Sequence, residues 1–217
     1  MRRSVVNRLI AKDLYMYRGV MTGALVAGVV SLVVSVVDGR DNVTTGLNIG
    51  FLLFITTIIT FGVVVAMFGI LRERQDHSQL FVLSLPISAG QYARAKVSAA
   101  VAAFGIPWTV LTAGVVGLTV ATGQPTSGLP FFVALMLFFF CNFCLLTAVI
   151  VITMSEIWAT VGILVTNLSV TLFLMYVSAW RVGWDATLAG IVALELVVAL
   201  SSIGLALYLP SRRRDVL

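Results

Sequence analysis

Apolar runs of about 20 residues recur along this chain and constrain its fold more than any other feature, because about 20 apolar residues cross the ~30 Å hydrocarbon layer of a bilayer as a helix. The runs do not alternate polar and apolar residues, as the strands of a membrane barrel do. Hydrophobic residues make up 60% of the 217 and charged residues only 11%, a balance unlike that of a soluble domain. The sequence therefore predicts an all-α, polytopic membrane protein with a single transmembrane domain over residues 1–217.

Six membrane spans follow from these runs. We expect them over residues 19–37, 46–71, 97–122, 129–154, 157–180 and 187–209. The boundary between the fourth and the fifth span is the least marked, because only Met154, Ser155 and Glu156 interrupt the apolar stretch there.

Lys and Arg residues support an even number of spans. Of the 14, five precede the first span, four lie within residues 72–96 and three close the chain, so six spans place twelve of them on one side. The positive-inside rule then predicts that both termini and the 72–96 loop are cytoplasmic. The net charge of +5 is spread over the ends of spans, so we expect membrane lipids as its partner and no nucleic acid.

Residues 1–18 have the pattern of an amphipathic helix at the cytoplasmic interface. Val6, Ile10 and Leu14 form one stripe, with Arg8, Lys12 and Asp13 elsewhere on the helix. One interpretation is an anchor that orients the first span, and the other is a segment that clasps a partner or gates lateral entry.

The sequence excludes several kinds of active site. Neither Lys12 nor Lys96 follows a Gly-rich phosphate-binding loop, so we expect no nucleotide site in this chain. His77 is the only histidine, which rules out a paired-histidine metal site. Cys141 and Cys144 share one face of the fourth span, and we interpret them as packing residues. We therefore expect no enzyme activity, no metal and no directly bound cofactor.

Glu195 is the polar residue in the spans that most favours a functional role. A carboxylate at membrane depth is costly, and it normally faces a cavity, a partner or a bundle interior. It is either a proton-coupling or transport-path residue, or a structural group that is protonated or hydrogen-bonded to Asn142 or Asn167. These three residues are our candidates for a transport path.

The most polar run of the chain, residues 72–96, encloses a short apolar patch at residues 80–85. The patch is apolar all round when wound as a helix, so it needs cover from a second protein as well as from its own bundle. At this point the chain resembles the ABC-2 type permease family, the membrane subunits of one class of ATP-binding-cassette transporters. The resemblance rests on Arg72-Glu73-Arg74, on Leu83-Ser84-Leu85-Pro86-Ile87-Ser88, on Ala95-Lys96 and on Lys12-Asp13-Leu14.

The resemblance implies that residues 72–96 form a cytoplasmic coupling helix that docks a separate ATPase subunit. The docking residues would be Arg74, Asp76, Leu80, Phe81, Leu83, Leu85 and Pro86. It also implies two ATPase copies, which bind the ATP and Mg²⁺, a second identical or different permease subunit, and a bacterial cytoplasmic membrane. The alternative to docking is a connector whose apolar residues dip into the interface.

These patterns lead to one main functional hypothesis and two others. We expect an ATP-driven exporter of a hydrophobic or amphiphilic substrate such as a drug, peptide or lipid. The first alternative is a proton-coupled secondary transporter that uses Glu195, and the second is a membrane scaffold or immunity protein without transport.

Overall fold

The computed structural model describes residues 2–41, 48–70, 89–121, 123, 126–179 and 183–212. Within these ranges all regular structure is helical. The elements are α1 (Arg2–Asp41), α2 (Ile49–Ile70), α5 (Ala89–Ala121), the short 3-10 helix η1 (Thr126–Gly128), α6 (Leu129–Thr153), α7 (Glu156–Ala179) and α8 (Ala186–Arg212).

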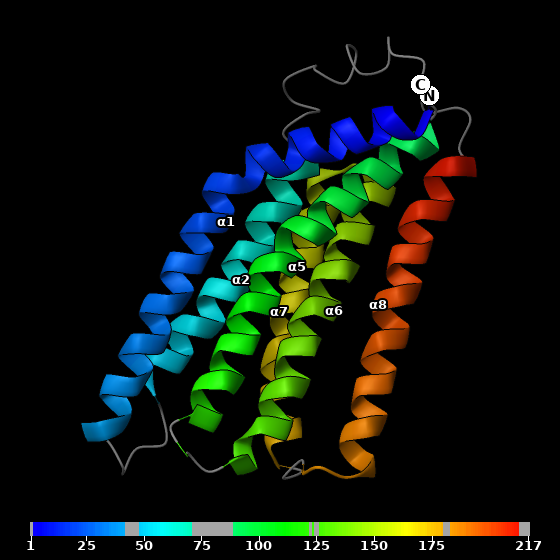
Figure 1. Cartoon of the computed structure of the whole chain (residues 1–217). Helices are drawn as coiled ribbons and strands as arrows, with labels where there is room; N and C mark the ends of the chain where they lie inside the picture. Colours follow the sequence, from blue (N-terminus) through cyan, green and yellow to red (C-terminus); the bar gives the residue numbers. More distant parts are fainter. Residues whose placement is uncertain are drawn as a thin grey trace.

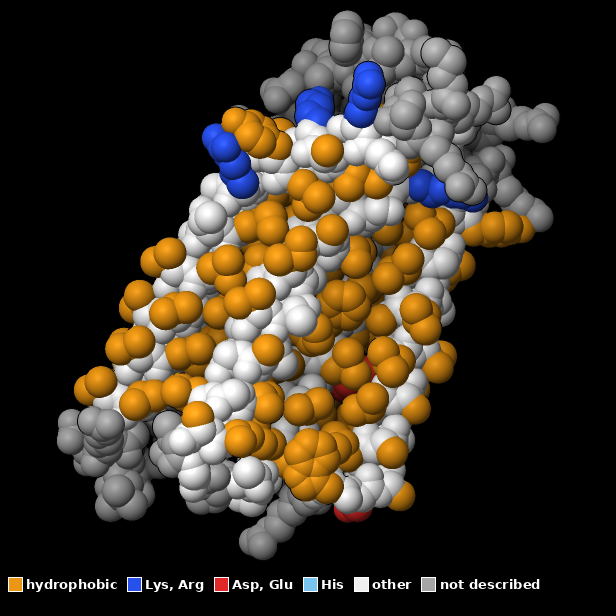
Figure 2. Space-filling view, in the orientation of Figure 1, with side chains coloured by type: hydrophobic (Ala, Val, Ile, Leu, Met, Phe, Trp, Pro, Cys, Tyr) orange, Lys and Arg blue, Asp and Glu red, His pale blue; other side chains and the backbone are white. Residues whose placement is uncertain are grey.

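Six α-helices in the described ranges are each long and apolar enough to cross a bilayer, which confirms the predicted all-α fold and the expected number of apolar helices. Successive helices run in opposite directions, so α1 begins and α8 ends at the same end of the bundle, called here the N-terminal end (Figure 1). Hydrophobic side chains cover the length of the visible face, and Lys and Arg side chains gather at the N-terminal end (Figure 2). This distribution fits a bundle that stands in a membrane.

The centre of the bundle is formed by α5 and α6. The central helix α6 contacts α2, α5, α7 and α8, and sixteen of its 25 residues are buried. In contrast, α7 packs mainly against α6 and leaves most of its apolar side chains exposed. Since apolar side chains at membrane depth are stable against lipid or another membrane helix, either can cover this outer surface of α7.

The first helix joins the predicted interfacial segment and the first span into one element. At 40 residues and ~1.5 Å per residue, α1 is about 60 Å long, far more than a bilayer core requires. Its first turns run across the N-terminal end of the bundle, and the helix then bends and descends along α2 and α5 (Figure 1). The predicted stripe of Val6, Ile10 and Leu14 is partly buried, whereas Arg8 and Lys12 are exposed.

The last eight residues of the predicted 72–96 loop are helical and continuous with the third predicted span. Helix α5 begins at Ala89, eight residues before the expected start at Val97. These first two turns contain Arg94 and Lys96. Their charges lower the local hydropathy, so hydropathy alone begins the third span later in the chain. The residues at positions 71–88 lie outside the described part of the chain.

Aromatic stacking holds the central helices together. The ring of Phe104 on α5 stacks on Phe143 of α6 at a centroid distance of 4.2 Å, and on Phe61 of α2 at 5.6 Å. The indole of Trp108 donates a hydrogen bond to the backbone oxygen of Met136 across 2.9 Å. These contacts hold α2, α5 and α6 together in the middle of the bundle.

The boundary between α6 and α7 consists of Met154 and Ser155, close to the predicted interruption. Met154 has φ 50°, a left-handed conformation, and its N–H donates to the oxygen of Ile150 across 2.8 Å. A left-handed residue that bonds back to the last turn is a common way to end a helix. This turn sends α7 back along α6.

Candidate functional site

A buried ion pair joins the start of α1 to the start of α5. The Nζ atom of Lys96 lies 2.8 Å from Oδ2 of Asp13, and the two side chains are 7% and 3% exposed. Asp13, which lies off the predicted apolar stripe of residues 1–18, is thus buried, and Lys96 is buried with it. Each charge offsets part of the cost of burying the other, and apolar periodicity cannot reveal such a pair.

The pair fixes one boundary of the predicted docking loop. Lys96 lies in the second turn of α5, which follows residues 71–88 directly. Outside the described residues lie the side chains proposed to dock an ATPase, which are Arg74, Asp76, Leu80, Phe81, Leu83, Leu85 and Pro86. Their role in docking stays a prediction.

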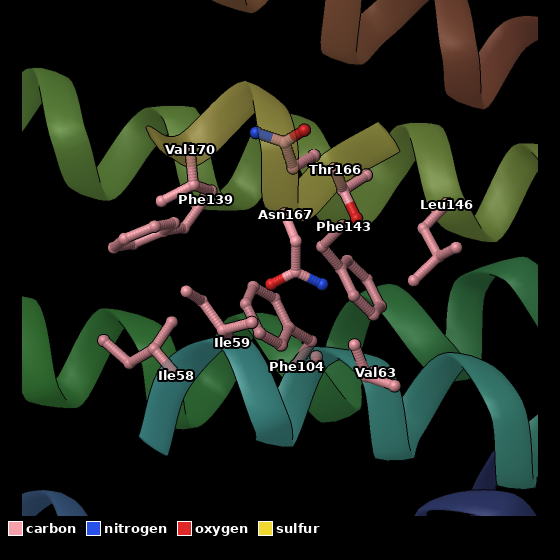
Figure 3. A pocket seen from close by; sticks show the side chains of 12 residues that line it. Ile58, Ile59, Val63, Phe104, Phe139, Phe143, Leu146, Thr166, Asn167 and Val170 are labelled. Carbon is pink, nitrogen blue, oxygen red and sulfur yellow. The ribbon is translucent and has the colours of Figure 1, made fainter. Parts of the chain in front are cut away.

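Two of the three candidate transport-path residues share a cavity of about 40 Å³ between α2, α5, α6 and α7. Figure 3 shows Thr166 and Asn167 reaching from α7 toward Ile59 and Val63 of α2. Asn142 lies on the α6 wall. Because about 15 Å³ is enough for one water molecule, a cavity of this size with amide and hydroxyl groups has room for water and is too small for an amphiphile.

Asn142 also fixes α7 to α6. Its Nδ2 donates to the backbone oxygen of Phe138 across 3.0 Å, and its Oδ1 accepts a hydrogen bond from Ser169 Oγ at 3.0 Å. The amide of Asn167 donates to the oxygen of Ile163 in its own helix. Sequence reasoning missed Thr166 and Ser169, although the polar cluster Thr166, Asn167 and Ser169 within an apolar span was a visible signal.

A second cavity, of about 250 Å³, lies between α1, α2, α5 and α6 at the end of the bundle opposite the N-terminal end. Its walls are mainly apolar, with the hydroxyl-bearing residues Ser35 and Thr119 among them. Sequence patterns gave no signal for this space, because it depends on how the ends of four helices pack together.

Glu195 lies apart from both cavities, in the contact between α8 and α6. It is 5% exposed, and neither carboxylate oxygen has a hydrogen-bond partner among the described residues. Of the three surroundings expected for it, a cavity, a partner or the bundle interior, the structure shows the bundle interior, and Glu195 bonds to neither Asn142 nor Asn167. Cys141 on α6 lies within electrostatic range of its carboxylate.

Buried residues on α8 explain why Glu195 lies where it does. Leu188, Glu195, Ala199, Ser202 and Ala206 recur at spacings of three, four and seven residues, which places them on one helical stripe. Three of them are small, so α8 approaches its neighbours α6 and α5 closely. Glu195 therefore lies in the contact between α8 and α6 because its neighbours on the same stripe pack there.

Cys141 and Cys144 are both buried and free. In the part of the chain that the structure describes, no group of three or more His, Cys, Asp or Glu residues could hold a metal ion. The interpretation of both thiols as packing residues fits this environment.

Comparison with known proteins gave no match to any protein-family model, any curated protein or any solved structure. The family resemblance therefore rests on the motif residues alone.

Proposed function

We propose that this chain is the membrane subunit of an ATP-driven transporter of the ABC-2 type. It exports a hydrophobic or amphiphilic substrate and docks a separate ATPase through residues 72–96. The observation that supports the proposal most is the ion pair of Asp13 and Lys96. Each residue belongs to one of the motifs that carry the resemblance, and the two motifs, far apart in the sequence, contact each other beside the docking loop.

The distribution of charge supports a cytoplasmic position for the N-terminal end. The five Lys and Arg side chains that the structure describes all belong to the N-terminal part of α1 or the first turns of α5. Those on the visible face gather near this end (Figure 2). By the positive-inside rule, this end faces the cytoplasm. An ATPase could then reach the loop that connects α2 to α5 from the side where ATP is available.

Mechanical coupling follows from the same pair. A displacement of residues 71–88 by nucleotide binding moves the first turns of α5, and Lys96 transmits that displacement to Asp13 on the interfacial part of α1. Since α5 also contacts α2, α6 and α8, it carries the movement into the centre of the bundle. The chain itself contributes no catalytic residue, and ATP and Mg²⁺ bind to the ATPase.

Substrate transport in this proposal requires a second permease subunit. Drug-sized ligands occupy sites of roughly 300–1,000 Å³, and the cavity beside Asn142 and Asn167 measures only about 40 Å³. The cavity lies where α7 and α2 face each other without close packing, and the exposed outer surface of α7 is apolar. A second copy or a related subunit opposite this face would complete a path between the two halves.

The docking proposal is tested with substitutions in the apolar patch. We expect Phe81→Asp or Leu83→Asp to abolish co-purification of the ATPase while membrane insertion stays normal. Gln79→Asp adds the same charge at a polar position of the same loop and should leave co-purification intact. Retained ATPase binding in both patch variants would contradict docking and favour the interfacial connector.

Glu195 favours one second candidate function, a proton-coupled secondary transporter, because it is a buried acid without a hydrogen-bond partner among the described residues. In that case transport collapses with the proton gradient and in Glu195→Gln, and it continues when the ATPase is removed. A membrane scaffold would show neither dependence, and no substrate would accumulate.

A further inference from the structure

The position of Glu195 poses a chemical problem that the docking proposal does not address. A carboxyl group that is 5% exposed, with both oxygens unpartnered in the described structure, lies about 14 Å along α8 from Ala186. An ionised carboxylate there lacks the hydrogen bonds and the counter-charge that a buried ion requires. Something must neutralise this group while α8 is packed against α6 as the structure shows.

The surroundings of Glu195 identify what neutralises it. Glu195 lines neither of the two cavities, and no cluster of metal-ligating side chains surrounds it in the described ranges. A metal cation needs several oxygen ligands at once, which this contact does not provide. A proton needs no cavity and no further ligand.

Titratable groups on the two helices packed against α8 are few. On α6 they are Cys141, which lies within electrostatic range, and Cys144 one turn further along. On α5 they are Tyr92, Arg94 and Lys96. All three lie in its first two turns at the N-terminal end, whereas Glu195 is nearer to the opposite end. Lys96 is also paired with Asp13, so no cation from either helix compensates Glu195.

We propose that Glu195 is a proton-binding site that controls the contact between α6 and α8. With the proton bound, the neutral acid lies within the stripe of small residues and the contact is closed, as in this structure. When the proton is lost, the carboxylate needs water, because unpaired charge in an apolar interior is unstable. Water then enters the contact beside Cys141.

The first test measures the protonated acid directly. Dicyclohexylcarbodiimide is apolar and adds to protonated carboxyl groups, so it reports a neutral acid within a membrane. In the full chain in lipid nanodiscs, we expect mass spectrometry to find the adduct on Glu195 at mildly acidic pH and several-fold less of it at alkaline pH. Glu195→Gln should lose the adduct, whereas Glu156→Gln, which removes an exposed acid at the start of α7, should keep it. Because the closed contact can also keep the reagent out, an infrared difference spectrum reads the acid without it, and absence of a protonated-carboxyl band that Glu195→Gln removes would overturn the protonated state.

The second test follows the opening of the contact through the two natural cysteines. Single-cysteine chains, Cys144→Ala and Cys141→Ala, are labelled with a water-soluble methanethiosulfonate at mildly acidic and alkaline pH. Alkaline pH increases the reactivity of any thiol, so the rate at Cys141 is divided by the rate at Cys144. We expect this ratio to rise several-fold with pH in chains that carry Glu195 and to stay constant when Glu195→Gln is added. Equal behaviour with and without Glu195 would overturn the proposal.

Both tests use the permease without an ATPase, so their outcome is separate from that of the docking experiment. A proton-dependent contact could regulate an ATP-driven permease or couple a secondary transporter.

Discussion

Asp13 and Lys96 form an ion pair 2.8 Å apart although their helices are separated in the chain by α2 and the segment after it. Removing one partner leaves the other charge buried without this counter-charge, and breaking a buried pair typically costs about 3–5 kcal/mol. We therefore expect Asp13→Asn and Lys96→Met each to lower the free energy of unfolding by that amount. Denaturation by sodium dodecyl sulfate in mixed micelles would measure the loss.

Exchanging the two charges distinguishes the stability that comes from pairing from the effect of each charge alone. The double variant Asp13→Lys with Lys96→Asp should recover part of the lost stability, because the two charges again compensate each other. The control is Lys12→Met, which removes an exposed charge from the neighbouring position and should change stability by less than about 0.5 kcal/mol. Additive losses in the double variant would show that the pair contributes no coupling.

The sequence was sufficient to predict the six spans because each run is long and almost uncharged. It could not predict the pairing of Asp13 with Lys96, since no local pattern shows that two charges far apart in the chain compensate each other. The start of α5 at Ala89 was missed for the same reason. A charged Lys96 favours a loop in a hydropathy pattern as long as its buried partner is unknown. Long-range compensation is thus the information that hydropathy lacks.

The sequence likewise predicted part of the candidate site and not the rest. Glu195 was predicted to face the interior because a carboxylate at membrane depth has few alternatives. Its separation from Asn142 and Asn167 depends on which face of α6 contacts α8 and which contacts α7. Because α6 is central and apolar on every face, its sequence does not distinguish these two faces. The 40 Å³ cavity follows from packing that no local pattern encodes, although the polar residues of its α7 wall were visible in the sequence.

Gly50 allows α1 and α2 to touch at the end opposite the N-terminal end. A Cβ atom at this position would overlap the backbone of Ser35, which cannot move aside as a flexible side chain can. Overpacking of this kind typically costs about 1–3 kcal/mol, so Gly50→Ala should lower the thermal unfolding temperature in detergent. Gly23→Ala on α1 is the matched control, because nothing lies within 4 Å of its Cβ position. Equal effects of the two substitutions would contradict the close contact.

Met154 ends α6 in a left-handed conformation with φ 50°. For a residue with a Cβ atom this conformation costs roughly 1–2 kcal/mol, whereas glycine adopts it freely. We expect Met154→Gly to raise the unfolding temperature. Met175→Gly, in the exposed interior of α7, should lower stability by about 1 kcal/mol instead. A loss of stability in both variants would show that the Met154 side chain contributes more than its backbone conformation costs.

The hydrogen bond from Ser169 to Asn142 is an interhelical contact of α7, whose main neighbour is α6. Hydrogen bonds between membrane helices average about 0.6 kcal/mol in double-mutant cycles. Ser169→Ala, Asn142→Ala and the double variant should therefore give a coupling energy of about that size. Thr171→Ala in place of Ser169→Ala should show no coupling to Asn142, because its hydroxyl bonds within α7.

Asn167 tests whether the transport path passes the small cavity. Asn167→Leu removes a polar group from the cavity wall, and a lost hydrogen bond of about 1–1.5 kcal/mol corresponds to about a tenfold slower transport. The measurement is accumulation of a fluorescent amphiphile in inverted vesicles that contain the permease and its ATPase. Thr171→Leu makes the same kind of change one turn further along α7, at an exposed position outside the set of residues that line the cavity, and should leave transport unchanged. Normal transport by Asn167→Leu, with the ATPase still bound, would place the path elsewhere, and the 250 Å³ cavity beside Ser35 and Thr119 would be the next position to test.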